Sequence, residues 1–249
     1  MQQYIIGNWK MNGTKEEAQK LALGFLKRVQ QATRPLPHII LCPPYPYLVS
    51  AMDVLKSSPI DLGAQDCHPE KNGAFTGDVS VLQLVDVGCK YVIVGHSERR
   101  QYHHDETPLI GQKIKAAIKG GLRPILCVGE TTEDRKTGKA LQVISTLLAT
   151  DLPESFTPND LLIAYEPLWA IGTGQTPSLD QVEEVMGLIK HELSLRITGG
   201  SLIPTLYGGS VNVHNAPHLL NLPHVDGLLV GGLSLKLDEF WEIITASQR

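Results

Sequence analysis

The feature of this sequence most suggestive of chemistry is a glutamate at the end of an apolar segment. Glu166 follows Leu161–Tyr165, a run that predicts a buried strand, and Pro167 ends that strand. The following loop, 167–173, is largely apolar, which is unusual for an exposed connection and indicates that it closes onto something. A carboxylate beside an apolar closing loop suits removal of a proton from a substrate in a site that excludes water.

Other polar residues and glycines follow other apolar segments. Asn8 and Lys10 follow the first segment, and His96 and Glu98 follow the fourth. Two glycine-rich turns follow the seventh and eighth segments: Gly208-Gly209-Ser210 and Gly231-Gly232. Each feature alone has an ordinary explanation, such as a solvated cation, a structural histidine or a tight turn. They become one site only if the strands that carry them end on the same face.

The alternation of segments predicts such an arrangement. Short apolar runs indicate strands at 4–7, 38–42, 61–64, 91–95, 124–129, 161–165, 204–207 and 225–230. Helical periodicity lies between them, at 15–30, 45–55, 79–87, 108–119, 134–149, 179–196, 213–220 and 237–247. Repeated strand–helix units favour parallel pairing with right-handed crossovers. We therefore expect an α/β fold, an eight-stranded parallel (β/α)8 barrel, with residues 1–249 forming a single domain.

A doubly wound open sheet is the alternative fold. Such a sheet usually carries Gly-x-Gly-x-x-Gly after its first strand, and this sequence has no such motif there. In the barrel, by contrast, active sites lie at the carboxyl ends of the strands, where the polar residues above are expected to meet.

Proton transfer next to a carbonyl is the chemistry that fits this set. Glu166 is the candidate base, and removal of a proton beside a carbonyl creates an enediolate. His96, Lys10 and Asn8 are candidates to stabilise the negative charge on its oxygens. His96 precedes an expected helical turn, whose N-terminus favours a neutral imidazole. The two glycine-rich turns let backbone N–H groups approach an anion, so we expect a phosphate there.

Composition bounds the class of protein and its partners. The net charge of −4 and pI of about 6.1 argue against nucleic acid as the main partner. The four cysteines show no Cys-x-x-Cys spacing, which is typical of buried structural thiols in a reducing compartment. The N-terminus has no signal-peptide pattern, and no apolar stretch reaches membrane-spanning length. We expect a soluble, cytoplasmic protein with no membrane partner.

Together the motifs resemble the triosephosphate isomerase family over nearly the whole chain. The matching stretches, in family order, are Gly7–Asn12, Gly73–Gly77, Gly95–Arg100, Cys127–Glu130, Tyr165–Pro167, Trp169–Gly174, Tyr207–Val211 and Val230–Gly232. The resemblance implies interconversion of dihydroxyacetone phosphate and D-glyceraldehyde 3-phosphate, in glycolysis and gluconeogenesis, with no metal and no organic cofactor.

The resemblance also implies a role for each candidate residue. Glu166 is the implied base, His96 the electrophile that shuttles protons between oxygens, Lys10 with Asn8 the electrostatic support, and Glu98 a supporting residue. The implied phosphate-binding N–H groups come from Gly172, Ser210, Gly231 and Gly232. Segment 167–173 is the implied lid, which Tyr207 and Ser210 hold shut.

Segment 65–80 is a long connection with an aromatic residue, Phe75. It is either a self-packed loop or, as the resemblance implies and we favour, an arm that inserts into a second subunit. The second interpretation predicts a homodimer in which Thr76 lies near the partner's active site.

Two substitutions depart from the common family pattern, and one cluster invites another interpretation. Leu168 stands where Val is frequent and Leu233 where Ala is frequent, both modest apolar changes that leave charges and donors in place. The run His103–Glu106 superficially resembles a metal cluster, but adjacent histidines do not converge easily on one ion, so we expect a solvated loop.

Two rival functions remain open at this point. A Schiff-base aldolase would use Lys10 as its nucleophile, although a lysine just past a strand end beside Asn8 suits electrostatics better. A non-catalytic phosphate-ligand sensor would have no use for the base Glu166.

Overall fold

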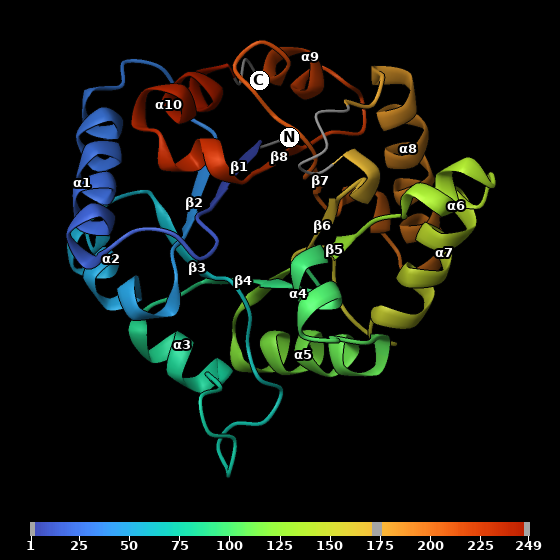
Figure 1. Cartoon of the computed structure of the whole chain (residues 1–249), viewed down its shortest axis with the longest axis horizontal. Coiled ribbons are helices and arrows are strands. Elements are labelled where there is room, and N and C mark those ends of the chain that lie inside the picture. The colour runs from blue at the N-terminus through green and yellow to red at the C-terminus, as the bar shows by residue number, and fades with distance from the viewer. Residues whose placement is uncertain (1–2, 171–175, 247–249) are drawn as a thin grey trace.

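Eight parallel strands close into a barrel in sequence order, which confirms the predicted fold class (Figure 1). The computed structural model describes residues 3–170 and 176–246. The strands are β1 (Tyr4–Asn8), β2 (His38–Cys42), β3 (Asp61–Ala64), β4 (Tyr91–Val94), β5 (Arg123–Val128), β6 (Leu162–Tyr165), β7 (Thr205–Tyr207) and β8 (Gly227–Val230). The barrel closes because β1 pairs with both β2 and β8, with Tyr4 opposite His38 on one side and Gly227 on the other.

Helices surround the strands as an outer ring (Figure 1). They are α1 (Lys15–Gln31), α2 (Leu48–Leu55), α3 (Val81–Val87), α4 (Ser97–Tyr102), α5 (Thr107–Gly120), α6 (Thr132–Lys136), α7 (Ala140–Asp151), α8 (Leu179–Arg196), α9 (Ala216–Leu220) and α10 (Leu237–Thr245). Short 3₁₀ segments are η1 (Tyr45–Tyr47), η2 (Leu168–Ala170), η3 (Gly200–Leu202) and η4 (Gly232–Leu235).

Local capping chemistry explains where the expected helices differ. The helix expected from residue 79 begins after Ser80, whose side chain accepts the N–H of Gln83 in a capping box. The helix expected over 134–149 is divided into α6 and α7, because Gly138 between them adopts φ +71. The helix expected from residue 213 begins only at Ala216, after a turn closed by Asn212 and Asn215 side chains.

The apolar core has two layers, one inside the barrel and one between strands and helices. Alternate strand residues point inward and include Ile6, Ile40, Ile93, Ile125, Leu162 and Leu229. The residues between them, such as Ile5, Ile39 and Val92, pack outward against the helices. The inner layer is crowded, because a Cβ on Gly63 would lie 2.6 Å from the sulfur of Cys42. The barrel interior is therefore packed, and a ligand must bind at one end of it.

All four cysteines are free and buried, as expected for structural thiols. Burial raises the pKa of the Cys67 and Cys89 thiols to about 12, which keeps them uncharged at neutral pH.

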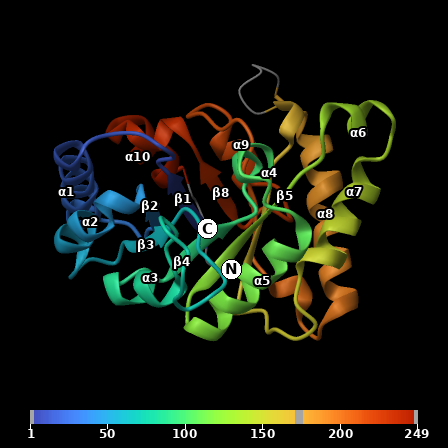
Figure 2. The same ribbon diagram turned by 60° about the horizontal axis from the view of Figure 1, so that its bottom comes forward.

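Segments that follow the carboxyl ends of the strands gather at one end of the barrel. Helices α4 and α6 lie toward the upper side in Figure 2, after β4 and β5. The connection between β3 and α3 extends away from the body of the molecule (Figure 1, bottom).

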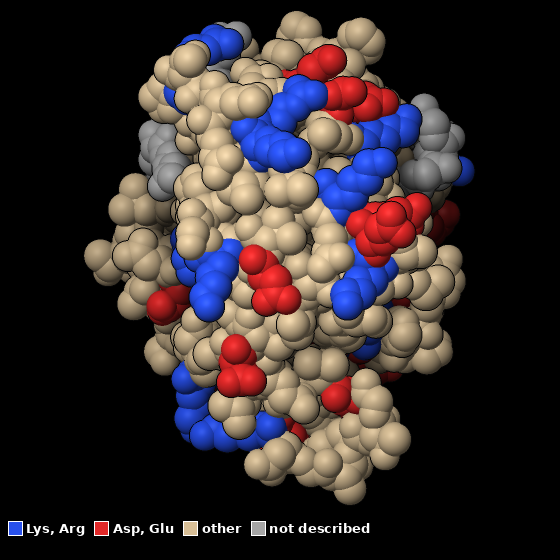
Figure 3. Space-filling model, turned by 90° about the vertical axis from the view of Figure 1, so that its left-hand side faces the viewer, with Lys and Arg blue, Asp and Glu red and all other residues tan. Residues whose placement is uncertain are grey.

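Over the side that carries α1 and α2, basic and acidic side chains are interspersed (Figure 3). Within the described ranges, no helix is long and apolar enough to cross a membrane.

Candidate active site

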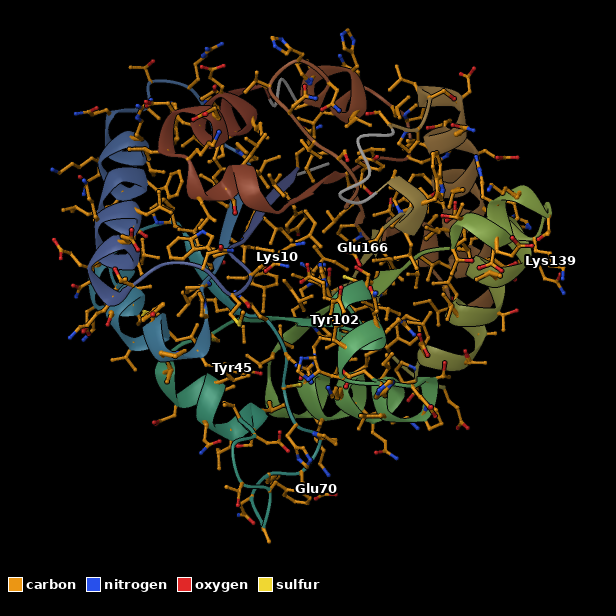
Figure 4. All side chains as sticks on the ribbon, in the orientation of Figure 1. Lys10, Tyr45, Glu70, Tyr102, Lys139 and Glu166 are labelled. Carbon is orange, nitrogen blue, oxygen red and sulfur yellow. The ribbon has the colours of Figure 1, made fainter. Side chains whose placement is uncertain are left out.

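A cavity of about 460 Å³ lies where the predicted site residues converge. Seven of the nine line it: Asn8, Lys10, His96, Glu166, Ser210, Gly231 and Gly232. Glu98 reaches the site through Lys10, and Gly172 lies outside the described residues. Lys10 and Glu166 lie near the centre of the ring of helices (Figure 4), and both line this cavity. The structure therefore brings together residues from β1, β4, β6, β7 and β8.

Lys10 has an unusual backbone that the surrounding residues hold in place. Its φ is +53, a left-handed value that costs free energy for a residue with a side chain. Its N–H donates to Asn8 Oδ1 at 3.0 Å, and its carbonyl accepts from Gln65 Nε2 at 2.9 Å. Gln65 also donates to the carbonyl of Cys42 at 2.8 Å. Asn8 and Gln65 thus fix the conformation that turns Lys10 into the cavity.

The Lys10 ammonium is paired with Glu98, its Nζ lying 2.6 Å from Oε1. Their side chains are 28% and 44% exposed, so solvent still reaches the pair. The pairing sets the position of the ammonium while leaving it able to attract an anion in the cavity.

His96 and Glu166 are in direct contact. His96 Nε2 lies 3.0 Å from Glu166 Oε1, and the backbone N–H of Ser97 donates to Glu166 Oε2 at 3.1 Å. His96 is the N-cap of α4, and its Nδ1 accepts the N–H of Glu98 at 3.2 Å. Because Nδ1 accepts a hydrogen bond, the proton of a neutral imidazole is on Nε2 and points at Glu166.

Burial and pairing act in opposite directions on these two groups. Burial alone raises the pKa of Glu166, but His96 and the Ser97 N–H lower it more, so the pKa lies below its usual value. Burial lowers the pKa of His96, whereas the Glu166 carboxylate raises it, and the net direction is upward. The Glu166 pairing thus opposes the neutral imidazole that the helix N-terminus and the Glu98 N–H favour. The carboxylate is ionised at neutral pH and can serve as a base.

Glycines line the side of the cavity formed by β7 and β8. A Cβ on Gly208 would lie 3.0 Å from Glu166 Cγ, and one on Gly209 would lie 2.3 Å from the hydroxyl oxygen of Tyr207. A Cβ on Gly231 would lie 3.3 Å from Lys10 Cε, whereas one on Gly232 would meet nothing within 4 Å. The Gly208 N–H donates to the carbonyl of Tyr165 at 2.8 Å. Glycine at these positions keeps side chains out of the cavity wall, which lets an anion approach the backbone closely.

The loop after β6 contains structure that the sequence analysis missed. Leu168–Ala170 form η2, and Ser210 Oγ donates to the carbonyl of Ala170 at 2.9 Å. Ser210 therefore contacts the expected lid, whereas the buried hydroxyl of Tyr207 has no hydrogen-bond partner within the described part of the chain. Ile171, Gly172 and Thr173 of that lid lie outside the described residues.

Glu130 is the main site-supporting residue that the sequence analysis did not assign. It is fully buried, and its Oε1 accepts from the hydroxyl of Tyr165 at 3.0 Å and from Trp169 Nε1 at 2.7 Å. It follows β5 and Gln65 follows β3, so collecting polar residues at all eight strand ends would have found both.

The run His103–Glu106 is only partly the solvated loop that we expected. His103, His104 and Glu106 are exposed, but Asp105 is buried. Its Oδ2 accepts from Arg99 Nε at 2.9 Å and from Lys113 Nζ at 2.6 Å, because the chain turns inward after His104, whose φ is +55. Among the described residues no group of three or more His, Cys, Asp or Glu side chains is placed to hold a metal ion.

Fold and site together define a (β/α)8-barrel enzyme with a carboxylate, an imidazole and an ammonium group around one cavity. A model of the triosephosphate isomerase family matches residues 3–247. The chain belongs to the triosephosphate isomerase family, and is therefore an isomerase of the intramolecular oxidoreductase class, which interconverts aldoses and ketoses.

Individual relatives agree along the full length. A triosephosphate isomerase of Rhodopirellula baltica is 43% identical over 247 residues, covering 98% of this chain and 96% of that protein. That of Carboxydothermus hydrogenoformans is 44% identical, with 98% of each chain covered. The crystal structure of triosephosphate isomerase from Bartonella henselae superposes with a TM-score of 0.90 at 37% identity and covers 100% of both chains.

Proposed function

We propose that this protein interconverts dihydroxyacetone phosphate and D-glyceraldehyde 3-phosphate through an enediolate, as a step of glycolysis and gluconeogenesis, with no metal or organic cofactor. The single observation that carries this proposal is the contact of His96 Nε2 with Glu166 Oε1 in the cavity beside Lys10. An ionised carboxylate, a nitrogen that bears a proton and a cation are the groups that a proton shift next to a carbonyl needs.

Glu166 removes the proton from the carbon next to the carbonyl. The electron pair of that C–H bond forms a carbon–carbon double bond, while the π pair of the carbonyl moves onto its oxygen. His96 donates its Nε2 proton to that oxygen and takes a proton from the neighbouring hydroxyl. The negative charge of the enediolate thereby moves from the first oxygen to the second. Glu166 then returns its proton to the other carbon, which completes the isomerisation without loss or gain of electrons.

Glu166 must leave its observed partners before it can act. The Nε2 proton of His96 points at one acceptor at a time, so a substrate oxygen that accepts it displaces Glu166 Oε1. Gly208 lies against the Glu166 side chain, and its lack of a Cβ leaves room for that movement. The observed contact therefore represents a resting arrangement that substrate binding rearranges.

Lys10 and Asn8 support the charge that develops on the substrate oxygens. The ammonium is fixed by Glu98, and the strained backbone of Lys10 is fixed by Asn8. Groups that are positioned before the reaction stabilise a transition state without reorganisation. Glu98 in this arrangement supports the site by positioning Lys10.

The substrate phosphate binds, in our proposal, along the wall that follows β7 and β8, where Gly231 adjoins Lys10. Gly231 and Gly232 border open space at the start of η4, and Ser210 lies on the adjoining loop. With Gly172, these residues supply the backbone N–H donors for the phosphate in our proposal. Segment 167–173 closes over it, and Ser210 and Tyr207 retain the closed segment.

We further propose a homodimer formed through the arm 65–80. The arm extends from the body of the molecule (Figure 1), and it carries Phe75, which is 43% exposed, and the exposed Thr76. Met11, adjacent to Lys10, is 95% exposed. Exposed apolar side chains such as these are suited to burial by a second subunit, and we propose that Thr76 then lies near the partner's site. A cytoplasmic location, one domain, and the absence of nucleic-acid and membrane partners stay predictions.

The test is isomerase activity of the purified protein in excess EDTA, with glyceraldehyde 3-phosphate as substrate and a dehydrogenase that reports dihydroxyacetone phosphate. Glu166→Gln should abolish activity, whereas the matched surface variant Glu154→Gln should leave it unchanged. A folded protein that binds phosphate but has no activity would support the sensor alternative. A substrate adduct trapped on Lys10 by borohydride would support the aldolase alternative.

A further inference from the structure

Arg100 lies behind the reacting residues and joins the ends of two strands. Its Nε donates to the carbonyl of Gly95 at 2.8 Å, and its Nη2 donates to the carbonyl of Cys127 at 3.1 Å. Gly95 connects β4 to His96. Cys127 precedes Val128, whose carbonyl accepts the backbone N–H of Glu166 at 2.8 Å. One guanidinium therefore links the backbone beside His96 to the backbone that holds Glu166.

A buried carboxylate fixes the orientation of this guanidinium. Arg100 Nη2 also donates to Asp151 Oδ2 at 2.7 Å, and the Asp151 side chain at the end of α7 is fully buried. Burial raises the pKa of Asp151 above its ordinary value, although Arg100 opposes that shift. A carboxylate in such a place needs a cation beside it, so the two residues hold each other in one arrangement.

The backbone before His96 is shaped around the guanidinium. Gly95 adopts φ +70, and a Cβ at this position would lie 3.0 Å from Arg100 Nη2 and 3.3 Å from Ile110 Cδ1. Glycine is needed both for the left-handed turn and for the close approach. A guanidinium holds five N–H donors in one rigid plane, so it can reach acceptors on several sides at fixed directions. The lysine ammonium has three donors on a flexible stem and does not reproduce those directions.

We propose that Arg100 is a positioning residue for the isomerisation, with Asp151 as its buried anchor, and that it sets the placement of His96 relative to Glu166. This inference rests on the proposed roles of those two residues. In the proposed function the phosphate is bound by residues that follow β7 and β8. Among the described residues, the hydrogen bonds of the Arg100 side chain go to Gly95, Cys127 and Asp151, and none goes to those loops. Loss of Arg100 should therefore affect turnover more than substrate binding.

The experiment compares Arg100→Lys and Asp151→Asn with the control Arg123→Lys. Arg123 also bridges strands, with Nη1 donating to the Tyr4 hydroxyl at 3.0 Å and Nη2 to the Leu161 carbonyl at 3.4 Å, but at the amino ends of the strands. Steady-state kinetics, thermal unfolding and the ¹⁵N–¹H resonance of His96 Nε2 are measured for each variant.

We expect kcat to fall at least about tenfold in both test variants while KM changes less than about threefold, because a displacement near 1 Å at a reacting group costs up to about 100-fold. The His96 resonance should shift in both, whereas Arg123→Lys should keep kcat and the resonance and lose only thermal stability. If Arg100→Lys does not fold, the test rests on Asp151→Asn alone. That variant keeps the shape of the side chain and one acceptor oxygen.

Values of kcat within twofold of the parent in the folded test variants, or an equal loss in Arg123→Lys, would overturn the proposal. The His96 resonance distinguishes failure of this proposal from failure of the proposed function. A fully active Glu166→Gln variant would exclude the proposed catalytic roles, but the resonance would still report whether Arg100 sets the placement of His96.

Discussion

The Nε2 atom of His96 lies 3.0 Å from Oε1 of Glu166, although the two residues follow different strands, β4 and β6. The contact depends on three backbone features: the Ser97 N–H that holds Glu166, the Glu98 N–H that holds Nδ1 of His96, and the Val128 carbonyl that accepts the Glu166 N–H. The predictions below test what this arrangement does and what supports it.

Glu166→Asp should lower kcat by roughly 100-fold and leave KM within about threefold, because the shorter side chain withdraws the base by one methylene from the reacting carbon. Steady-state kinetics in both directions measure this change, and Glu154→Asp is the control. A kcat near that of the parent protein would exclude Glu166 as the base.

Lys10→Ala should raise KM and lower kcat together, because in the proposed mechanism the ammonium interacts with both the bound substrate and the enediolate. The variant also leaves Glu98 without its cation near the anion site, which adds repulsion. Glu98→Gln serves as the comparison and should have a smaller effect on both constants. Unchanged kinetics in Lys10→Ala would remove this residue from the site.

Phe75→Asp should shift the protein from dimer to monomer and reduce kcat, since the arm then carries a charge into the interface. Leu202→Asp, at another exposed apolar position that is 58% exposed, should leave the assembly unchanged. Sedimentation velocity at micromolar concentration gives the answer. A parent protein that sediments as a monomer would contradict the proposed dimer.

Gly129→Ala should destabilise the fold by about 3 kcal/mol or more, in the range of severe steric clashes. Its Cβ would lie 1.8 Å from the carbonyl oxygen of Glu166, a backbone atom that cannot move aside. Gly232→Ala, whose Cβ meets nothing within 4 Å, should unfold like the parent and show its effect only in KM. Urea denaturation of both variants, with assays of the second, tests this difference.

Asp61→Asn should reduce the free energy of unfolding by about 1–2 kcal/mol at pH 7. Burial raises the pKa of Asp61, but its contacts with His38 Nε2 and Lys90 Nζ, each at 2.6 Å, lower it below 3.8 overall. A carboxyl group with a depressed pKa stabilises the fold above its unfolded pKa and loses that effect as the pH falls through its folded pKa.

The difference between Asp61→Asn and the parent should therefore narrow as the pH falls below about 4. Urea titrations at several pH values measure it. A difference that stays constant down to pH 3 would show that the contribution of Asp61 does not depend on its charge.

Sequence alone predicted the fold class and most residues of the candidate site, because strand–helix alternation and residues at strand ends are local features that the chain order preserves. Closure of the barrel brings Asn8, Lys10, His96 and Glu166 to one rim wherever the strand boundaries fall. The positions of Glu166 after an apolar run and of glycines after β7 and β8 were visible for the same reason.

Only the tertiary structure decided which polar side chains are buried and what they contact. The sequence predicted a solvated loop around Asp105, whereas Asp105 is buried between Arg99 and Lys113. It gave no reason to expect that Glu130 would accept from Trp169, or that Arg100 would join Gly95, Cys127 and Asp151. These contacts depend on the directions in which side chains from different elements point, and packing around the closed barrel fixes those directions rather than local propensity.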